Sequence, residues 1–384
     1  MTALGQDRLA TSGHSTPSNS RIDSLNRRRY TQYMLEGTLM NETRFHRPSG
    51  GSVWLGKDMA RRKDWIYRLP PAALAEIDAC VEMLRRNPKP LDDIGSEDFP
   101  FASIAEPVAV FRRLLATGRG FVSIRGIDPE KYSDDELGMI FWGLGRHFGH
   151  AVPQSFMGDR LGTVMDLTDE EPDPRRRRGY HSAGFQSVHT DACDIVGMIG
   201  IRTAKQGGAS RLVSAAAVHN AMLDMCPDLL AVLYEGLICR MPDSDAAAMG
   251  IAPLIPHRVP AYTYDGGWLN AHYVRGYVQR AVNAGDSQLN PREQAAIDVF
   301  LSIGNHPDFT LEYMLEPGDI QIFNNRTILH GRAHFQDHPE KDRRRHLKRL
   351  WLQVEDWPEI PASQRALYGG SPENWRDPPR HARA

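Results

Sequence analysis

Residues 187–204 read SVHTDACDIVGMIGIRTA and contain His189 and Asp191, two positions apart. The run is rich in valine and isoleucine, which favour β-strands. Side chains at positions i and i+2 of a strand project from the same face, so a strand here would aim an imidazole and a carboxylate at one point. The pair alone does not distinguish a metal clamp from two unrelated polar residues at the end of a strand.

Similar β-type runs occur on both sides of this stretch. They are GFVSIRGI (120–127), LGTVMDL (161–167), SRLVSA (210–215), FTLEYMLEPGDIQIFNN (309–325), which holds two strands joined by a Pro-Gly turn, and LKRLWLQV (347–354). Segments with helical patterns lie among them, at 70–87, 106–117, 133–149, 215–238 and 291–304. Pro227 should divide the fourth of these into two helices. Because strands and helices do not alternate regularly, we expect a mixed α+β fold, a mostly antiparallel barrel with added helices.

The composition predicts a globular protein with a net charge near zero. The chain has 384 residues, 41% of them hydrophobic, and a formal charge of −2 from 46 basic and 48 acidic residues. This balance creates no field that would attract nucleic acid or an anionic membrane, so neither is expected as a partner. No apolar run approaches the roughly 18 residues of a membrane-spanning helix. Four cysteines without CxxC spacing favour reduced thiols and a cytoplasmic location.

Residues 1–45 are predicted to form a flexible N-terminal tail. They are rich in Ser, Thr, Asn and Arg and lack apolar periodicity, so burial cannot offset the entropy lost on ordering them. A mitochondrial transit peptide is the alternative, since the segment is rich in Arg and Ser. Against it, NRRRYTQYMLEGTLM (26–40) has no clear amphipathic face. Residues 46–384 are expected to form a single domain.

A third candidate ligand is His330, in the segment NNRTILHGRAHF (324–335), where it is expected just after a strand. Gly331 follows it and would let another backbone pass close to a crowded site. Two histidines and one carboxylate leave three coordination positions open, as in non-haem Fe(II) oxygenases. A second HxD sequence, His306 to Asp308, is expected to be a loop, because Pro307 cannot donate to a strand ladder.

The ordered motifs resemble the taurine dioxygenase (TauD/TfdA-like) family of Fe(II)- and 2-oxoglutarate-dependent dioxygenases. The matching segments are HTD (189–191), GGAS (207–210), NNRTILHGRAHF (324–335) and RHLKRLWL (345–352), within a region of about 100–355. The resemblance implies a double-stranded β-helix (jelly-roll, cupin-like) core with surrounding helices and a metal at one mouth. It also implies Fe(II), with 2-oxoglutarate and O₂ as cosubstrates.

The resemblance also implies roles for six residues. His189, Asp191 and His330 would bind Fe(II), Ser210 and Arg345 would hold the distal carboxylate of 2-oxoglutarate, and Arg349 would lie close behind, near cosubstrate and substrate. Arginine suits such a site because its planar guanidinium matches a carboxylate with two parallel hydrogen bonds.

The register of the basic segment leaves alternatives for the arginine. Arg343 or Arg344 would take the place of Arg345 if the strand slipped by one or two residues. Strand alternation favours Arg345, because it then shares one face with Leu347 and Arg349. The other face would carry His346 and Lys348.

The activity that the resemblance implies is hydroxylation or desaturation of a C–H bond in a small organic substrate, coupled to conversion of 2-oxoglutarate and O₂ to succinate and CO₂. The presence of Asp191 argues against halogenation, since related halogenases have a small residue there. The alternatives are a zinc-dependent hydrolase or lyase with the same ligands and a non-catalytic metabolite-binding barrel. The sequence does not choose the substrate, and it is compatible with a homo-oligomer.

Several other residues are weaker candidates. Arg332 would orient the site or pair with an acid outside it, and Cys193 is expected to be a small packing residue. His219 and His272 are expected to be structural histidines. The loop 175–186 would cover the metal site and offer substrate contacts through His181, Phe185 and Gln186. The segment 271–281, which contains Arg275, would be a substrate wall or a packing segment.

Overall fold

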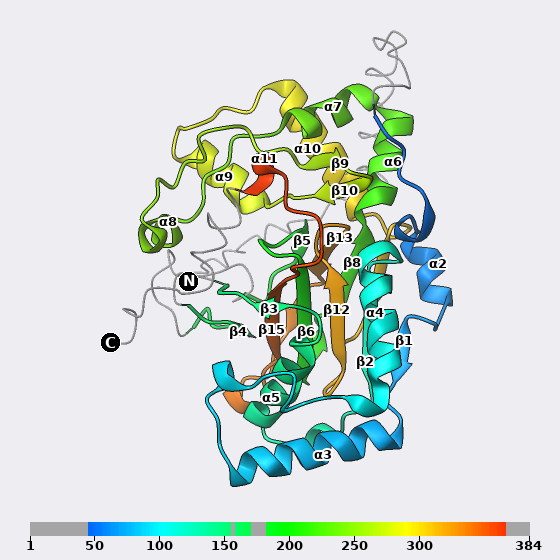
Figure 1. Cartoon of the computed structure of the whole chain (residues 1–384). Helices are drawn as coiled ribbons and strands as arrows, with labels where there is room; N and C mark the ends of the chain where they lie inside the picture. The colour runs from blue at the N-terminus through cyan, green and yellow to red at the C-terminus, as the bar shows by residue number, and fades with distance from the viewer. Residues whose placement is uncertain (1–44, 155–157, 170–181, 366–384) are drawn as a thin grey trace, which may run out of the picture. The chain divides into compact units, whose positions relative to one another are not determined.

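The computed structural model describes residues 45–154, 158–169 and 182–365 (Figure 1). The predicted tail, 1–45, falls outside these ranges except for Phe45, so its flexibility and any targeting role remain predictions. The single domain at 46–384 likewise remains a prediction. No helix in the described part of the chain is long and apolar enough to cross a membrane.

Two sheets form the centre of the fold. The large sheet contains, in order, β1 (Ile66–Arg68), β2 (Phe121–Arg125), β12 (Ile320–Asn324), β6 (Ile195–Arg202), β15 (His346–Gln353) and β3 (His150–Ala151), with β4 (Leu161–Val164) also paired to β15. The smaller sheet contains β11 (Thr310–Tyr313), β8 (Ser210–Ser214), β13 (Ile328–Arg332) and β5 (Gln186–His189). Two further strand pairs complete the described sheets. A hairpin joins β9 (Tyr262–Asp265) to β10 (Trp268–Ala271), and β7 (Gln206–Gly207) pairs with β14 (Phe335–Gln336), which is distant in sequence.

The two sheets pack face to face and make a double-stranded β-helix, as expected. Their inner faces share one buried cluster, which includes Phe121, Val196 and Phe323 from the large sheet and Leu212, Leu311 and Ile328 from the smaller one. Strands β11, β12, β13 and β15 alternate between the sheets as the chain proceeds. The predicted Pro-Gly turn therefore joins two strands that do not pair with each other. Among the described strands only β1 and β2 pair in parallel, which confirms the mostly antiparallel barrel.

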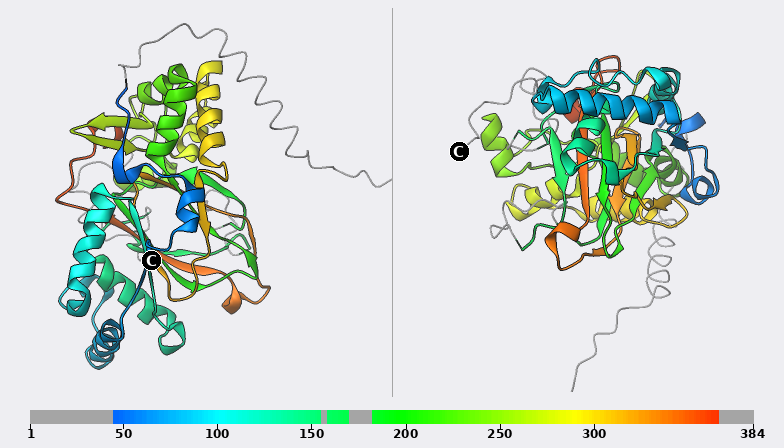
Figure 2. Two further views of the ribbon diagram at one scale, coloured as in Figure 1. Left: turned by 90° about the vertical axis from the view of Figure 1, so that its right-hand side faces the viewer. Right: turned by 90° about the horizontal axis from the view of Figure 1, so that it is seen from below.

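Helices surround this core. They are α2 (Gly56–Arg61), α3 (Pro71–Arg86), α4 (Ala105–Thr117), α5 (Asp134–Gly145), α6 (Ala215–Met225), α7 (Pro227–Glu235), α8 (Asp243–Met249), α9 (Arg275–Asn283), α10 (Pro291–Gly304) and α11 (Ala362–Arg365). Short 3₁₀ turns are η1 (Gly50–Ser52), η2 (Leu91–Asp93), η3 (Ala102–Ile104), η4 (Pro129–Lys131) and η6 (Lys341–Arg343). Helices α4 and α5 pack on the outer face of the large sheet and α3 packs against α5, while α6, α7 and α10 gather beyond the ends of the strands (Figure 2).

Local sequence signals explain where several helices begin. Ser133 and Glu136 form the predicted capping box at the start of α5, with reciprocal hydrogen bonds to each other's backbone N–H. Pro227 is the first residue of α7 and separates it from α6, as predicted. The segment 271–281 contains the start of α9, which the sequence analysis did not assign.

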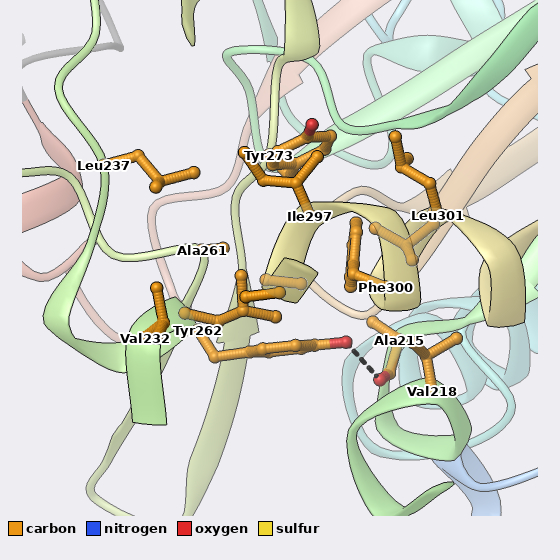
Figure 3. Close-up of a cluster of buried hydrophobic side chains, with 14 of the residues drawn as sticks. Ala215, Val218, Val232, Leu237, Ala261, Tyr262, Tyr273, Ile297, Phe300 and Leu301 are labelled. Carbon is orange, nitrogen blue, oxygen red and sulfur yellow. Dashed lines mark hydrogen bonds between the residues drawn. The ribbon is translucent and has the colours of Figure 1, made fainter. Parts of the chain in front are cut away.

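A second hydrophobic core lies under α6, α7 and α10 (Figure 3). Its centre is Tyr262 of β9, whose hydroxyl donates a 2.9 Å hydrogen bond to the carbonyl oxygen of Ala215. Phe300 packs edge-on against Tyr262 and also against Tyr273, the second residue after β10. The backbone of Tyr273 is hydrogen-bonded to Thr190 of the HTD segment, so this core supports the candidate site.

Candidate active site

Three side chains predicted as metal ligands lie together where β5 ends. One potential ligand atom from each of His189, Asp191 and His330 falls within 4.8 Å of the other two. His189 Nε2 is 4.0 Å from Asp191 Oδ1, and His330 Nε2 is 3.5 Å from Asp191 Oδ2. The two histidines are directly opposed on neighbouring strands, β5 and β13, and their ring centroids are 4.3 Å apart. Within the described residues, this is the one group with the geometry of a metal site.

The backbone around the ligands differs from the prediction in two ways. Strand β5 ends at His189, so Asp191 lies in the bend that follows and not on the same strand face. His330 lies inside β13 and not after a strand, because the chain turns back between Asn324 and Ile328. Gly331 does allow a close approach, since a Cβ there would lie 2.5 Å from the carbonyl oxygen of Gln186.

Asn325 holds the bend that carries Asp191. Its side-chain oxygen accepts a 2.9 Å hydrogen bond from the backbone N–H of Asp191. Its side-chain nitrogen donates 2.7 Å hydrogen bonds to the carbonyl oxygens of Asp191 and Cys193. Sequence reasoning missed this role, although Asn325 belongs to the NNR sequence that carries part of the family resemblance. Asparagine has both a donor and an acceptor, and this bend requires both.

Replacing Asn325 with alanine should lower the free energy of unfolding by about 3 kcal/mol or more, because three buried backbone groups would each lose a partner at about 1–3 kcal/mol apiece. Urea denaturation of the apo-protein measures this change. Asn283→Ala is the matched control: Asn283 is exposed, so its loss should change stability by no more than about 0.5 kcal/mol. Equal effects of the two substitutions would contradict the role of Asn325.

The opposite side of the bend is held by the segment after β10. Thr190 and Tyr273 exchange two hydrogen bonds: the Thr190 N–H donates to the Tyr273 carbonyl oxygen at 3.0 Å, and the Tyr273 N–H donates to the Thr190 hydroxyl at 2.9 Å. His272 Nδ1 lies 3.4 Å from the same hydroxyl. His272 was expected to be an ordinary structural histidine, and the structure places it beside the HTD segment.

The charge states of His189 and Asp191 suit a metal. Burial, with repulsion from His330, lowers the pKa of His189 to about 4, so this imidazole is neutral at neutral pH. Its Nδ1 lies 2.9 Å from the Ser187 carbonyl oxygen, and a hydrogen bond there leaves the lone pair on Nε2. Burial by itself would raise the pKa of Asp191, but Arg349 and the two histidines hold that pKa well below its usual range. Deprotonated ligands of this kind are ready for metal binding.

Arg349 and Trp351 contact the carboxylate of Asp191 from β15. The Arg349 guanidinium donates to Asp191 Oδ2 at 3.2 Å and to the side-chain oxygen of Gln154 at 2.7 Å. The Trp351 indole nitrogen donates to the same Oδ2 at 2.9 Å. Arg349 therefore lies against a candidate metal ligand, and its predicted place near cosubstrate and substrate stays a prediction. Neither Gln154 nor Trp351 was singled out from the sequence.

Arg345 is buried with only 4% of its surface exposed. Its Nη1 has no hydrogen-bond partner in the described part of the chain, and its Nη2 makes one long contact, 3.4 Å, to the carbonyl oxygen of Gly208. Burial, with repulsion from Arg332, lowers the pKa of Arg345 to about 9. Ser210, two residues after Gly208, is also buried and begins β8. The carboxylate of Asp337 acts on this guanidinium electrostatically but leaves the Nη1 donor without an acceptor, so a bound anion would stabilise Arg345 further.

Alternation along β15 agrees with the favoured register of the basic segment. His346 and Lys348 point away from the barrel interior, and both contact acidic residues at the start of α5. The two other candidate arginines lie at the surface: Arg343 is exposed, and Arg344 pairs with Asp169 at 2.7 Å. Of the three candidates, Arg345 is the one that is buried.

The weaker candidate residues occupy different environments in the structure. Arg332 is buried and, within the described residues, donates to the carbonyl oxygens of Ser182 and Gly184, just before β5. Cys193 and His219 are packing and structural residues, as expected; His219 lies 2.8 Å from the Tyr234 hydroxyl. Of the remaining candidates, Phe185 is 54% exposed and packs on Arg211, Gln186 is half-buried, Arg275 is exposed, and His181 lies outside the described residues. The second HxD sequence forms a turn between α10 and β11.

A double-stranded β-helix that brings two histidines and one aspartate together is the arrangement typical of non-haem iron oxygenases. Comparison with known proteins agrees. The family model described as "Taurine catabolism dioxygenase TauD, TfdA family" matches residues 87–351. The chain therefore belongs to the TauD/TfdA family of Fe(II)- and 2-oxoglutarate-dependent dioxygenases. Enzymes of this family use Fe(II), 2-oxoglutarate and O₂, so the predicted enzyme class and cofactors are confirmed.

Individual proteins of known name share low sequence identity with this chain. FR-33289 synthase of Streptomyces rubellomurinus is 28% identical over 326 residues, which cover 82% of this chain and 93% of the relative. Asparagine oxygenase in complex with Fe(II), 3-hydroxyasparagine and succinate superposes with a TM-score of 0.60 at 14% identity, over 75% of this chain and 93% of that one. The oxygenase OrfP in complex with Fe and α-ketoglutaric acid gives a TM-score of 0.56 at 15% identity, over 75% and 94%. The two structures confirm the fold.

Proposed function

We propose that this enzyme hydroxylates, or desaturates, an unactivated C–H bond of a small organic substrate. The observation that carries the proposal is the convergence of His189, Asp191 and His330 within 4.8 Å. These residues would hold Fe(II), since two imidazoles and one carboxylate leave three coordination positions for cosubstrate, O₂ and water.

The same proposal assigns Arg345 and Ser210 to the distal carboxylate of 2-oxoglutarate. The buried Arg345 Nη1 without a partner supports this assignment, because a dicarboxylate would supply the missing acceptor and balance the charge. Ser210 offers a hydroxyl donor in the same GGAS segment whose Gly208 carbonyl Arg345 contacts. For Arg349, the contacts favour a role in holding Asp191 rather than the cosubstrate.

Iron and cosubstrate together would supply the oxidising power: 2-oxoglutarate and O₂ yield succinate and CO₂, and one oxygen atom enters the substrate as a hydroxyl group. The protein's own residues set the direction of this chemistry by position. Asn325 fixes the bend that carries Asp191, and β5 and β13 fix the two histidines opposite each other. Arg345 would orient the cosubstrate through its far end.

The two alternatives explain fewer of these features. A zinc-dependent hydrolase or lyase needs the three ligands but has no use for a buried arginine with an Nη1 donor that lacks an acceptor. A non-catalytic barrel would bind metal or metabolite without consuming 2-oxoglutarate. Both differ from an oxygenase in having no dependence on O₂.

Anaerobic purification with Fe(II), followed by a screen for substrate-dependent succinate release on adding O₂, tests the proposal. Free amino acids come first in the panel, since the structures of asparagine oxygenase and OrfP contain hydroxyasparagine and hydroxyarginine. Sulfonates and nucleotides follow, the latter because uridine-5′-phosphate dioxygenases are among the relatives. Metabolite turnover that continues without O₂ or 2-oxoglutarate would contradict an oxygenase.

A further inference from the structure

The two oxygens of the Asp191 carboxylate have different surroundings. Oδ2 accepts hydrogen bonds from the Trp351 indole N–H at 2.9 Å and from the Arg349 guanidinium at 3.2 Å. Oδ1 accepts none from the described residues; it is 4.0 Å from His189 Nε2, while Oδ2 is 3.5 Å from His330 Nε2. The lone pairs of one oxygen are thus engaged by the protein, while those of the other remain available.

The Trp351 indole is itself held in place. Its backbone carbonyl accepts a 2.9 Å hydrogen bond from Val152, and its strand pairs with β6 at Val196. The Arg349 guanidinium lies 4.9 Å from the centre of its ring. Its indole packs against Ala192 and Ile360 on the side of the HTD bend. A donor fixed at so many points can hold an acceptor in one orientation.

We propose that Trp351 is a positioning residue for the metal centre: it holds Asp191 Oδ2 and thereby directs Oδ1 alone to the metal. This inference rests on the proposed function, since it requires that Asp191 bind the metal. One-oxygen binding matters because a carboxylate that binds through both oxygens would fill a position needed for cosubstrate or O₂. A partner that orients a metal ligand typically contributes a factor of about 10 to 100 in metal affinity.

Trp351→Phe tests this role, because phenylalanine keeps an aromatic ring on β15 but has no N–H donor, and the control below makes the same loss of ring size elsewhere. Co(II), which reports its coordination by visible absorption, is titrated into the apo-protein under anaerobic conditions. We expect the Co(II) dissociation constant to rise by about 10-fold or more. We also expect the Co(II) spectrum to change toward a higher coordination number as the carboxylate turns.

Trp142→Phe is the matched control. The indole N–H of Trp142 also donates a hydrogen bond, 3.0 Å long, to the Ile94 carbonyl oxygen. Trp142 lies in α5 and is buried in the core on the outer face of the large sheet. Its replacement should leave Co(II) affinity and spectrum unchanged. The thermal midpoints of both apo-variants show whether each has folded.

Two results would overturn the inference. One is that Trp351→Phe keeps the Co(II) affinity and spectrum of the unmodified protein. The other is that Trp142→Phe loses as much Co(II) affinity as Trp351→Phe. Asp191→Ala separates this failure from failure of the proposed function. If Co(II) binding persists unchanged in Asp191→Ala, the metal assignment itself is wrong. If Asp191→Ala loses binding and Trp351→Phe does not, only the role of Trp351 is wrong.

Discussion

The Asp191→Ala variant should lose succinate formation almost completely. We expect a decrease of more than about 100-fold, because loss of a residue that merely orients a metal ligand already costs about 10- to 100-fold. Asp191 is the one carboxylate in the candidate centre, and it is held by Asn325, Arg349 and Trp351. Succinate is measured chromatographically, with the substrate that the screen identifies and at saturating 2-oxoglutarate.

Asp308→Ala is the matched control, because it makes the same change in the second HxD sequence of the chain. Asp308 lies in the turn before β11 and pairs with Lys57 at 2.8 Å, with both side chains about half exposed. Such a surface pair contributes about 0–1 kcal/mol, so turnover and stability should be nearly unchanged. Full turnover in Asp191→Ala would refute the assignment of this residue as a metal ligand.

The Arg345→Ala variant should bind 2-oxoglutarate much more weakly. Truncating one partner of a buried hydrogen-bonded charge pair costs about 2 kcal/mol or more, which corresponds to a dissociation constant at least about 30-fold higher. Arg345 is suited to such a pair because it is 4% exposed and its Nη1 has no acceptor among the described residues. Anaerobic calorimetric titration of the Fe(II)-loaded protein with 2-oxoglutarate gives the constant without a known substrate.

Arg343→Ala and Arg344→Ala test the register of the segment. Arg343 is exposed and Arg344 pairs with Asp169 at the surface, so neither change should affect 2-oxoglutarate binding. A large effect of either one, with little effect of Arg345→Ala, would show that another arginine binds the cosubstrate. A loss shared equally by all three variants would indicate general electrostatics and not one binding residue.

Local patterns in the sequence were sufficient for most of the fold. Runs of β-favouring residues predicted β2, β6, β8 and β15, helical spacing of apolar residues predicted α3 to α7 and α10, and the capping box located the start of α5. The pairing of strands was less accessible, because β11 and β12 follow each other in sequence yet belong to different sheets. Strand β1 has only three residues, too few for a recognisable pattern, and the β9 and β10 pair was not predicted from the sequence either.

For the candidate site, the sequence by itself determined the family, the three residues predicted to bind metal and the arginine predicted to bind cosubstrate. It could do so because motif order and side-chain chemistry are local properties of the chain. The tertiary structure decided how Asp191 meets the two histidines: through a bend after β5 and not along a strand face. Asn325, Arg349 and Trp351 hold that arrangement by hydrogen bonds between segments distant in sequence. Such bonds leave no periodic trace, so only the folded chain reveals them.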